Sequence, residues 1–424
     1  MKSLMYPALQ KFYSALKHLM RFATENSFFD NIGCLDSFLS EFRSCTLTLQ
    51  TSLGDQNHPD YIKNRDEYLL KDEMIAKWMN DHRVTVVHKH PFSLKKVLRI
   101  VIYDYGNAVV FKKYEQSLEK EEPVSNYLQE IRDTLLSKLS PEINFSAQYV
   151  FVDDEDVNEV NIFDFIESGI IAMWQFLHVM KNDLEDNSDV ATTLMREIDS
   201  LVLSLPPRWE MDVVDYCYYR SDNSFERGWS LMMALPDVRI PTDVFLKTMN
   251  QMSANVETFY EAFIYCHTLA YIEQKHHLLT TFFIEYEDGT YQNINFAASI
   301  RTTMYRFINR VASIISKRKV VNVYLVTETV SYGGFGRQSI PVFLQLNYKE
   351  RTAYRNKTYL TFYKVTRLGE IETVMMDADS LVDRLSVSVA MGNMNQSQFS
   401  SHYSVMLTPI VESFKAKLKK DECL

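Results

Sequence analysis

The segment whose residues could most clearly carry out a reaction is Lys71–Pro91, in which Arg83 and His88 are separated by four residues. A histidine side chain can take up or release a proton near neutral pH. An arginine guanidinium offers a planar fork of N–H donors that stabilises charge on a phosphate. Together they could assist attack of a ribose 2′-hydroxyl on the adjacent phosphate. This is a route to RNA cleavage that needs no metal.

The residues around the pair predict a helix that carries both side chains. It should begin near Tyr61 and run to about His88, and Pro91 closes it because proline disfavours helix at the residue before it. On a continuous helix the two side chains point about 140° apart. A shared site must therefore lie between these directions, or the last turn must unwind. His90 fits a looser version of the same spacing.

An arginine followed four to six residues later by a histidine, near the end of a helix, resembles the signature of the HEPN superfamily. The helical segment Phe38–Arg43 before the motif helix, and Phe151–Asp154 followed by a long helix, are also similar to a group of uncharacterised bacterial proteins. The resemblance covers about residues 26–184. It implies a helical fold, a homodimer through the N-terminal domain, and metal-independent endoribonuclease activity in bacterial stress or phage defence.

The same resemblance implies roles for individual residues. Arg83 would bind the scissile phosphate of RNA, and His88 would handle the proton. Arg43 and His90 would support phosphate binding. In the active members two copies of the motif meet across the dimer interface, so one copy of this chain offers half of the expected site.

A second interpretation stays open, that of a non-catalytic protein that dimerises or binds a partner. Val84 follows the arginine, where active members commonly carry a polar residue. Arg83 could pair with Asp81, Glu73 or another domain, and His88 could cap the carbonyls at the end of its helix. The acidic net charge of −10 favours this alternative too.

Three weaker patterns point to other chemistry. The glycine-rich segment Gly333–Arg337 could expose backbone N–H groups to an anion, with Arg337 on a phosphate, although a connection between strands is the simpler interpretation. Asp153–Asp156 lacks the spacing and glycine of a calcium loop. His276 and His277 do not form a zinc-binding pattern. We therefore expect no metal and no cofactor.

The composition of the chain limits the ligands and the cellular compartment that we expect. A net charge of −10 and a pI near 5.6 argue against broad DNA binding. Five well-separated cysteines give no zinc-ligand spacing and no disulfide framework, which suits a reducing cytosol. The N-terminus lacks the pattern of a signal peptide, and the apolar window Asn161–Met180 contains Asp164 and Glu167. We expect a cytoplasmic protein with no membrane span.

The pattern of apolar residues predicts a multidomain chain, α-rich in its N-terminal and central regions and α+β at its C-terminus, with a mostly antiparallel or mixed sheet. We expect three parts: a helical domain over 1–184 with a β-hairpin near 97–111, a helical connector over 190–278, and an α+β domain over 279–424. In the last, Asp288-Gly289 between apolar runs predicts a hairpin. Strands are expected at Val320–Val330, Ile340–Tyr348, Thr358–Val365 and Ile371–Met376.

Overall fold

A computed structural model of the chain describes residues 3–422 except 24–25, 56, 105, 117–121, 136–139, 155–159, 205–212, 240–245, 248–249, 251–255, 276–277, 288, 334–341, 344 and 395–404. In these residues the chain forms twelve α-helices and two antiparallel sheets, of five and six strands. The protein is therefore a mixed α+β protein, with helices mostly N-terminal and sheets central and C-terminal.

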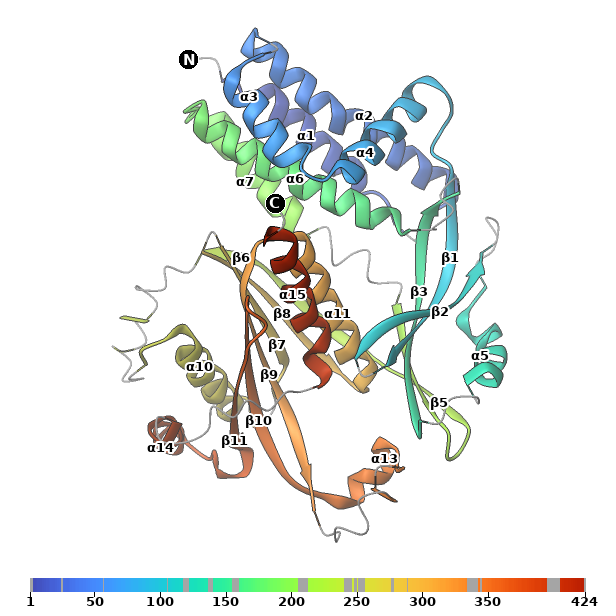
Figure 1. Cartoon of the computed structure of the whole chain (residues 1–424), viewed down its shortest axis with the longest axis vertical. Helices are drawn as coiled ribbons and strands as arrows, with labels where there is room; N and C mark the ends of the chain where they lie inside the picture. Colours follow the sequence, from blue (N-terminus) through green and yellow to red (C-terminus); the bar gives the residue numbers. More distant parts are fainter. Residues whose placement is uncertain are drawn as a thin grey trace. The chain divides into compact units, whose positions relative to one another are not determined.

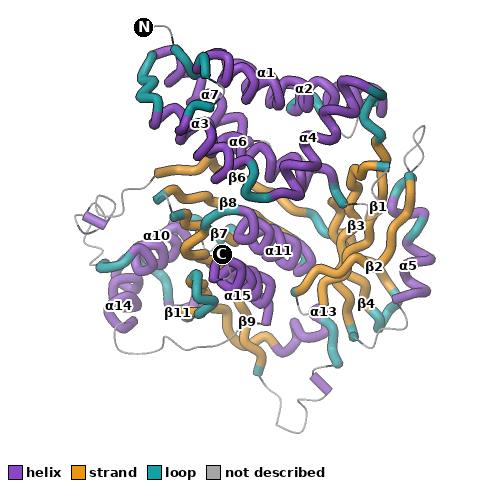
Figure 2. The backbone as a smooth tube through the Cα atoms, turned by 45° about the horizontal axis from the view of Figure 1, so that its top comes forward, coloured by secondary structure: helices purple, strands orange, loops and turns teal. Residues whose placement is uncertain are grey.

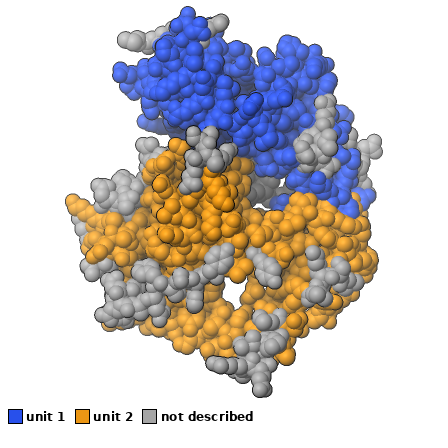
Figure 3. All heavy atoms as spheres, viewed as in Figure 1, with its two compact units in different colours: residues 1–99, 113–123, 148–213 blue, residues 100–112, 124–147, 214–424 orange. Residues whose placement is uncertain are grey.

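The chain divides into two compact units, coloured separately in Figure 3. Unit 1 comprises residues 1–99, 113–123 and 148–213, and unit 2 comprises residues 100–112, 124–147 and 214–424. The division falls inside four strands, and each unit is built from segments that are distant in the sequence. The expected break at about residue 184 followed a polar, acidic stretch of sequence, whereas these units follow tertiary contacts.

Unit 1 is a bundle of helices with one apolar core. Its helices are α1 (Tyr6–Leu19), α2 (Phe28–Leu53), α3 (Pro59–Asn64), α4 (Glu73–His88), α6 (Ile162–Asp183) and α7 (Asp189–Ser204). Phe12, Phe38 and Phe176 are fully buried in that core. Helix α6 contributes nine buried residues, although by length and composition it could cross a membrane. A buried helix was expected at this position.

The long helix expected from Tyr61 to His88 is interrupted. A π-helical turn, Arg65–Leu69, follows α3, and α4 starts anew at Glu73. The Asp72 side chain accepts a hydrogen bond from the backbone N–H of Ile75, which caps the new helix. The sequence offers a good N-cap residue within an otherwise helical pattern, and the chain uses it to turn. Helix α4 does continue to His88, as expected.

The five-stranded sheet has the order β2-β1-β3-β4-β5. Its strands are β1 (Leu94–Asp104), β2 (Asn107–Glu115), β3 (Glu142–Asp153), β4 (Val213–Tyr219) and β5 (Ser224–Arg227), with the short helix α5 (Leu128–Leu135) between β2 and β3. The hairpin predicted near 97–111 is confirmed by β1 and β2.

The prediction of a helical connector over 190–278 is wrong in the middle part of that range. Helices α7 and α10 (Phe259–Glu273) do form, but β4, β5 and β6 (Ser230–Arg239) lie between them. Five successive residues of β4 are buried, so the strand shows no alternation of apolar and polar residues. A short apolar run of this kind cannot be assigned by periodicity, and its valines and tyrosines favour a strand.

The six-stranded sheet forms the centre of unit 2, with the order β11-β10-β9-β7-β8-β6 and antiparallel pairing throughout. The remaining strands are β7 (Thr280–Tyr286), β8 (Thr290–Ala298), β9 (Val320–Tyr332), β10 (Arg355–Thr366) and β11 (Ile371–Asp377). The hairpin predicted at Asp288-Gly289 is confirmed by the pairing of β7 with β8, and Gly289 has a φ of +75°.

Helices cover both faces of this sheet (Figure 1, Figure 2). Helices α11 (Arg301–Lys317) and α15 (Thr408–Glu422) pack on one face with Val323 and Leu325 of β9, and α10 and α14 (Arg384–Met394) pack on the other with Tyr324 and Val326. Successive strand residues point to opposite faces, so β9 supplies both cores. The prediction of a strand at Ile340–Tyr348 is wrong for the described residues of that range. Helix α13 (Tyr348–Arg351) begins there, and Asn347 and Glu350 form a capping box at its start.

Candidate functional site

Arg83 and His88 both lie on α4, in its last two turns. His88 is the last residue of the helix and is exposed, whereas Arg83 is half-buried. The helix remains regular up to His88, and the backbone N–H groups of Lys89 and His90 both bond to the carbonyl of Thr85. The last turn therefore does not unwind, and the two side chains leave the helix in different directions.

In the described part of unit 1, Arg83 and His88 have no polar or ring partner. Among the residues that the structure describes, no ion pair, hydrogen bond or ring contact involves Arg83 or His88. The expected pairing of Arg83 with Asp81 or Glu73 is thus not found in the described part of unit 1. Within the described residues, no polar neighbour competes with a ligand for either group.

On α4, the histidine that pairs with a described neighbour is His82. This residue was not singled out in the sequence analysis. Its Nε2 lies 3.2 Å from a carboxylate oxygen of Asp153, and its ring packs against Trp78 and Phe92 at centroid distances of 4.3 and 4.9 Å. A signal was present, because His82 continues the apolar face marked by Ile75, Trp78 and Met79 at helical spacing. The pair joins α4 to β3 and sets the position of the helix that carries Arg83.

The supporting residues are not gathered at one place. The Arg43 guanidinium donates to Thr46 Oγ1 at 2.7 Å and lies near Tyr61, whose pKa burial raises and Arg43 lowers. His90 is exposed, with Nδ1 2.9 Å from the Pro91 carbonyl oxygen. Arg337, His276 and His277 lie outside the described residues.

The connection after α4 is nevertheless held in place. The backbone N–H of Phe92 donates to Asp36 Oδ1 on α2 at 3.0 Å. Burial raises the pKa of Asp36, and this hydrogen bond opposes the rise. Asp36 and the His82–Asp153 pair therefore anchor the chain on both sides of the segment that contains His88 and His90.

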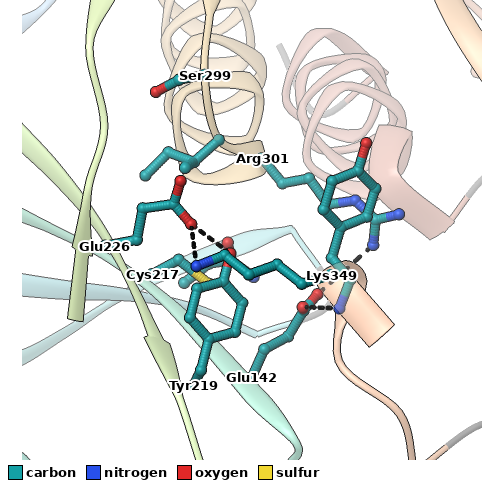
Figure 4. A pocket seen from close by; sticks show the side chains of 10 residues that line it. Glu142, Cys217, Tyr219, Glu226, Ser299, Arg301 and Lys349 are labelled. Carbon is teal, nitrogen blue, oxygen red and sulfur yellow. Dashed lines mark hydrogen bonds and ion pairs between the residues drawn. The ribbon is translucent and has the colours of Figure 1, made fainter. Parts of the chain in front are cut away.

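Unit 2 contains a second candidate, a cavity of about 80 Å³ lined mainly by charged and aromatic side chains (Figure 4). On one side Glu226 accepts a hydrogen bond from the Tyr219 hydroxyl at 2.7 Å and pairs with Lys349 at 3.2 Å. On the other, Glu142 lies 3.5 Å from the Arg301 guanidinium and accepts the backbone N–H of Tyr348 at 2.6 Å. The carboxylates and cations of this cavity thus satisfy one another.

The potential nucleophile in this cavity is Cys217, and its surroundings make it unreactive. Burial raises the pKa of the Cys217 thiol to about 12, with Glu142 adding to the rise. Burial and the hydrogen bond to Glu226 also raise the pKa of Tyr219. A thiol in this state carries almost no thiolate at neutral pH. The cavity is therefore best described as a set of polar contacts between α13 and the strands β3, β4 and β5.

The acidic residues on the strands of unit 2 do not form an acid–base pair. Glu285 accepts hydrogen bonds from Asn322 at 2.7 Å and Tyr324 at 2.8 Å, which fixes its carboxylate within the sheet. Asp288 lies outside the described residues.

No group of three or more histidine, cysteine, aspartate or glutamate side chains among the described residues is arranged to hold a metal ion. Comparison with known proteins gave no family model, no curated protein and no solved structure that matches this chain.

Proposed function

We propose that two copies of this chain form a metal-independent endoribonuclease whose site combines Arg83 and His88 from the α4 helices of both copies. The observation that carries the proposal is the availability of the two side chains: within the described residues, neither has a partner. Arg83 is half-buried and His88 is exposed, so neither side chain is sealed away from solvent.

The need for a second copy follows from the geometry of α4. The two side chains diverge by about 140° on a regular helix, so one copy does not direct both at the same phosphate. Val87, 44% exposed, lies beside His88, and Met74, 64% exposed, lies near the start of the helix. Val87 therefore offers apolar contact area to a second α4 close to His88, whereas Met74 points about 140° away from Val87 around the helix.

The chemistry assigns one step to each residue. The ribose 2′-oxygen attacks phosphorus while His88 accepts its proton, and the guanidinium of Arg83 offsets the charge that develops on the phosphate oxygens. The bond from phosphorus to the 5′-oxygen breaks, and the histidine of the second copy can protonate this leaving group. The products are a 2′,3′-cyclic phosphate and a 5′-hydroxyl.

The test uses the purified full chain, a 5′-labelled single-stranded RNA and excess EDTA. Cleavage to a cyclic phosphate is expected, and Arg83→Ala and His88→Ala should each reduce its rate by roughly 10²-fold or more. His18→Ala is the matched control, since His18 lies near the end of α1 and has no assigned role. Cleavage that survives both substitutions would eliminate this site.

A non-catalytic partner-binding protein is the second candidate, and Val84 favours it. This side chain is half-buried on α4, at a position where a polar residue is expected of an active member. A stable dimer that fails to cleave RNA, and that dissociates on Val87→Asp, would support this candidate over the first.

A further inference from the structure

The fold of unit 2 assembles a cationic surface that the sequence does not reveal. Three segments meet there: the end of α11 with the residues after it, the second half of α15, and the turn between β10 and β11. Figure 1 and Figure 2 both show α11 and α15 side by side. The segments bring together six cations, which we call the basic surface: Arg318, Lys319, Arg367, Lys415, Lys417 and Lys419.

Specific contacts establish that the three segments are neighbours. Lys417 Nζ donates to the carbonyl oxygen of Ile315 at 3.0 Å and also to that of Arg318. The aliphatic stem of Lys415 lies 3.4 Å from the position of a Cβ on Gly369, which places Lys415 against the β10–β11 turn. About a hundred residues of sequence separate the α11 segment from the α15 segment.

Part of the basic surface is held rigidly. The Arg318 guanidinium lies 3.6 Å from the centre of the Tyr286 ring, a cation–π contact with a buried tyrosine. Lys417 is fixed by its two carbonyl acceptors. Such ordering lowers the entropy lost when a ligand binds.

The other cations are exposed, and their acidic neighbours bind them only weakly. Lys319 is 71% exposed and pairs with Glu287 at 3.2 Å, while Lys415 is 51% exposed and lies 3.4 Å from Glu412. Exposed pairs of this kind contribute little free energy, so a polyanion can displace them. Lys415 and Lys419 are one turn apart on α15, which lets both reach successive phosphates of one strand.

We propose that the basic surface binds the phosphodiester backbone of single-stranded RNA. The surplus of cations stands out in a chain whose net charge is −10. Binding through phosphates would be independent of base sequence and strongly dependent on salt. This inference rests on the proposed function for its choice of RNA over an acidic protein. In this proposal, unit 2 binds the substrate RNA.

The test measures binding separately from cleavage, with the full chain and a fluorescent 2′-O-methyl oligouridylate, which has no 2′-hydroxyl to attack. The triple variant Lys319→Ala, Lys415→Ala, Lys419→Ala should bind at least tenfold more weakly. The slope of log affinity against log salt should fall by about 2, since each phosphate contact on a single strand contributes about 0.7. The control carries Lys63→Ala, Lys71→Ala and Lys247→Ala, three exposed lysines elsewhere.

The outcomes separate the two proposals. Weaker binding by the triple variant alone supports the basic surface, even if natural RNA is never cleaved. Equal weakening in the control would overturn it, because the effect would then follow net charge only. Displacement by polyglutamate as readily as by RNA would also overturn it, in favour of an acidic protein partner.

Discussion

The carboxylate of Asp215 on β4 and the guanidinium of Arg306 on α11 form a buried ion pair, with Nη2 3.0 Å from Oδ2 and Nε 3.1 Å from Oδ1. Thr303 and Ser146 each donate a further hydrogen bond to this carboxylate at 2.7 Å. Four donor groups thus satisfy one buried charge. Within unit 2, the pair joins the five-stranded sheet to the helix that covers the six-stranded sheet.

Asp215→Ala should therefore destabilise the protein by roughly 3–5 kcal/mol, because it breaks a buried ion pair by removing the carboxylate that Arg306, Thr303 and Ser146 all contact. Urea unfolding of unit 2 measures the change. The double variant Asp215→Ala, Arg306→Met should recover part of the loss, and Glu328→Ala, at an exposed glutamate on β9, should change stability by less than about 0.5 kcal/mol. A double variant as unstable as the single one would contradict this account.

His82 and His88 provide a matched pair of substitutions on α4. His82→Leu should destabilise unit 1 by about 1–3 kcal/mol, because it removes the imidazole that pairs with the carboxylate of Asp153, which is 9% exposed. His88→Leu, at an exposed position, should lie within about 0.5 kcal/mol of the wild type. Thermal unfolding compares them, and equal losses would show that our assignment of the structural histidine is wrong.

Asp186 should make the stability of unit 1 depend on acid. Burial by itself would raise its pKa, but hydrogen bonds from Ser3, the backbone N–H of Met5 and Ser188 lower it to about 2. Because this pKa lies below the ordinary value of 3.8, the stabilisation is present above pH 4 and is lost as the pH falls toward 2. After allowance for solvent screening we expect about 1 kcal/mol.

The comparison of Asp186→Asn with the wild type tests this dependence. The variant should unfold at lower urea concentration at pH 6, and the difference should shrink as the pH approaches 2. Asp189→Asn, three residues later, is the control. A difference that is the same at every pH would mean that the carboxylate charge contributes nothing.

Two glycines should respond to alanine in opposite directions. Gly106 has a φ of +88°, and a Cβ there would lie 3.1 Å from the carbonyl oxygen of Met406, so Gly106→Ala should destabilise unit 2 by about 1–2 kcal/mol. Gly33 lies within α2 with open space around it, so Gly33→Ala should stabilise the protein by up to about 1 kcal/mol. Urea midpoints with unchanged slopes would provide the comparison.

The polar contacts between α13 and the strands β3, β4 and β5 should control access to Cys217. In a background with Cys34, Cys266 and Cys423 replaced by serine, the 3% exposed Cys217 thiol should react slowly with a maleimide. Tyr348→Ala with Lys349→Ala removes the cation–π and ion-pair contacts of α13 and should raise the rate by about tenfold. Lys364→Ala, which breaks an ion pair on β10, should leave it unchanged.

Local patterns in the sequence determined most of the individual elements. The apolar spacing of α2 and α6, the hairpin turns at Gly106 and Gly289, and the strands β7, β9, β10 and β11 follow from interactions within a few residues. The same reasoning placed Arg83 and His88 near the end of a helix. Their chemistry depends on residue type and spacing, which the sequence states directly.

Only the tertiary structure decided which groups are occupied and which are available. His82 and His88 have identical side chains, and their different surroundings come from Asp153, about 70 residues away. The strand β4 and the break before α4 depended on packing and capping that periodicity does not encode. The basic surface likewise exists because α15 packs beside α11, and no local pattern predicts which distant segments will share a core.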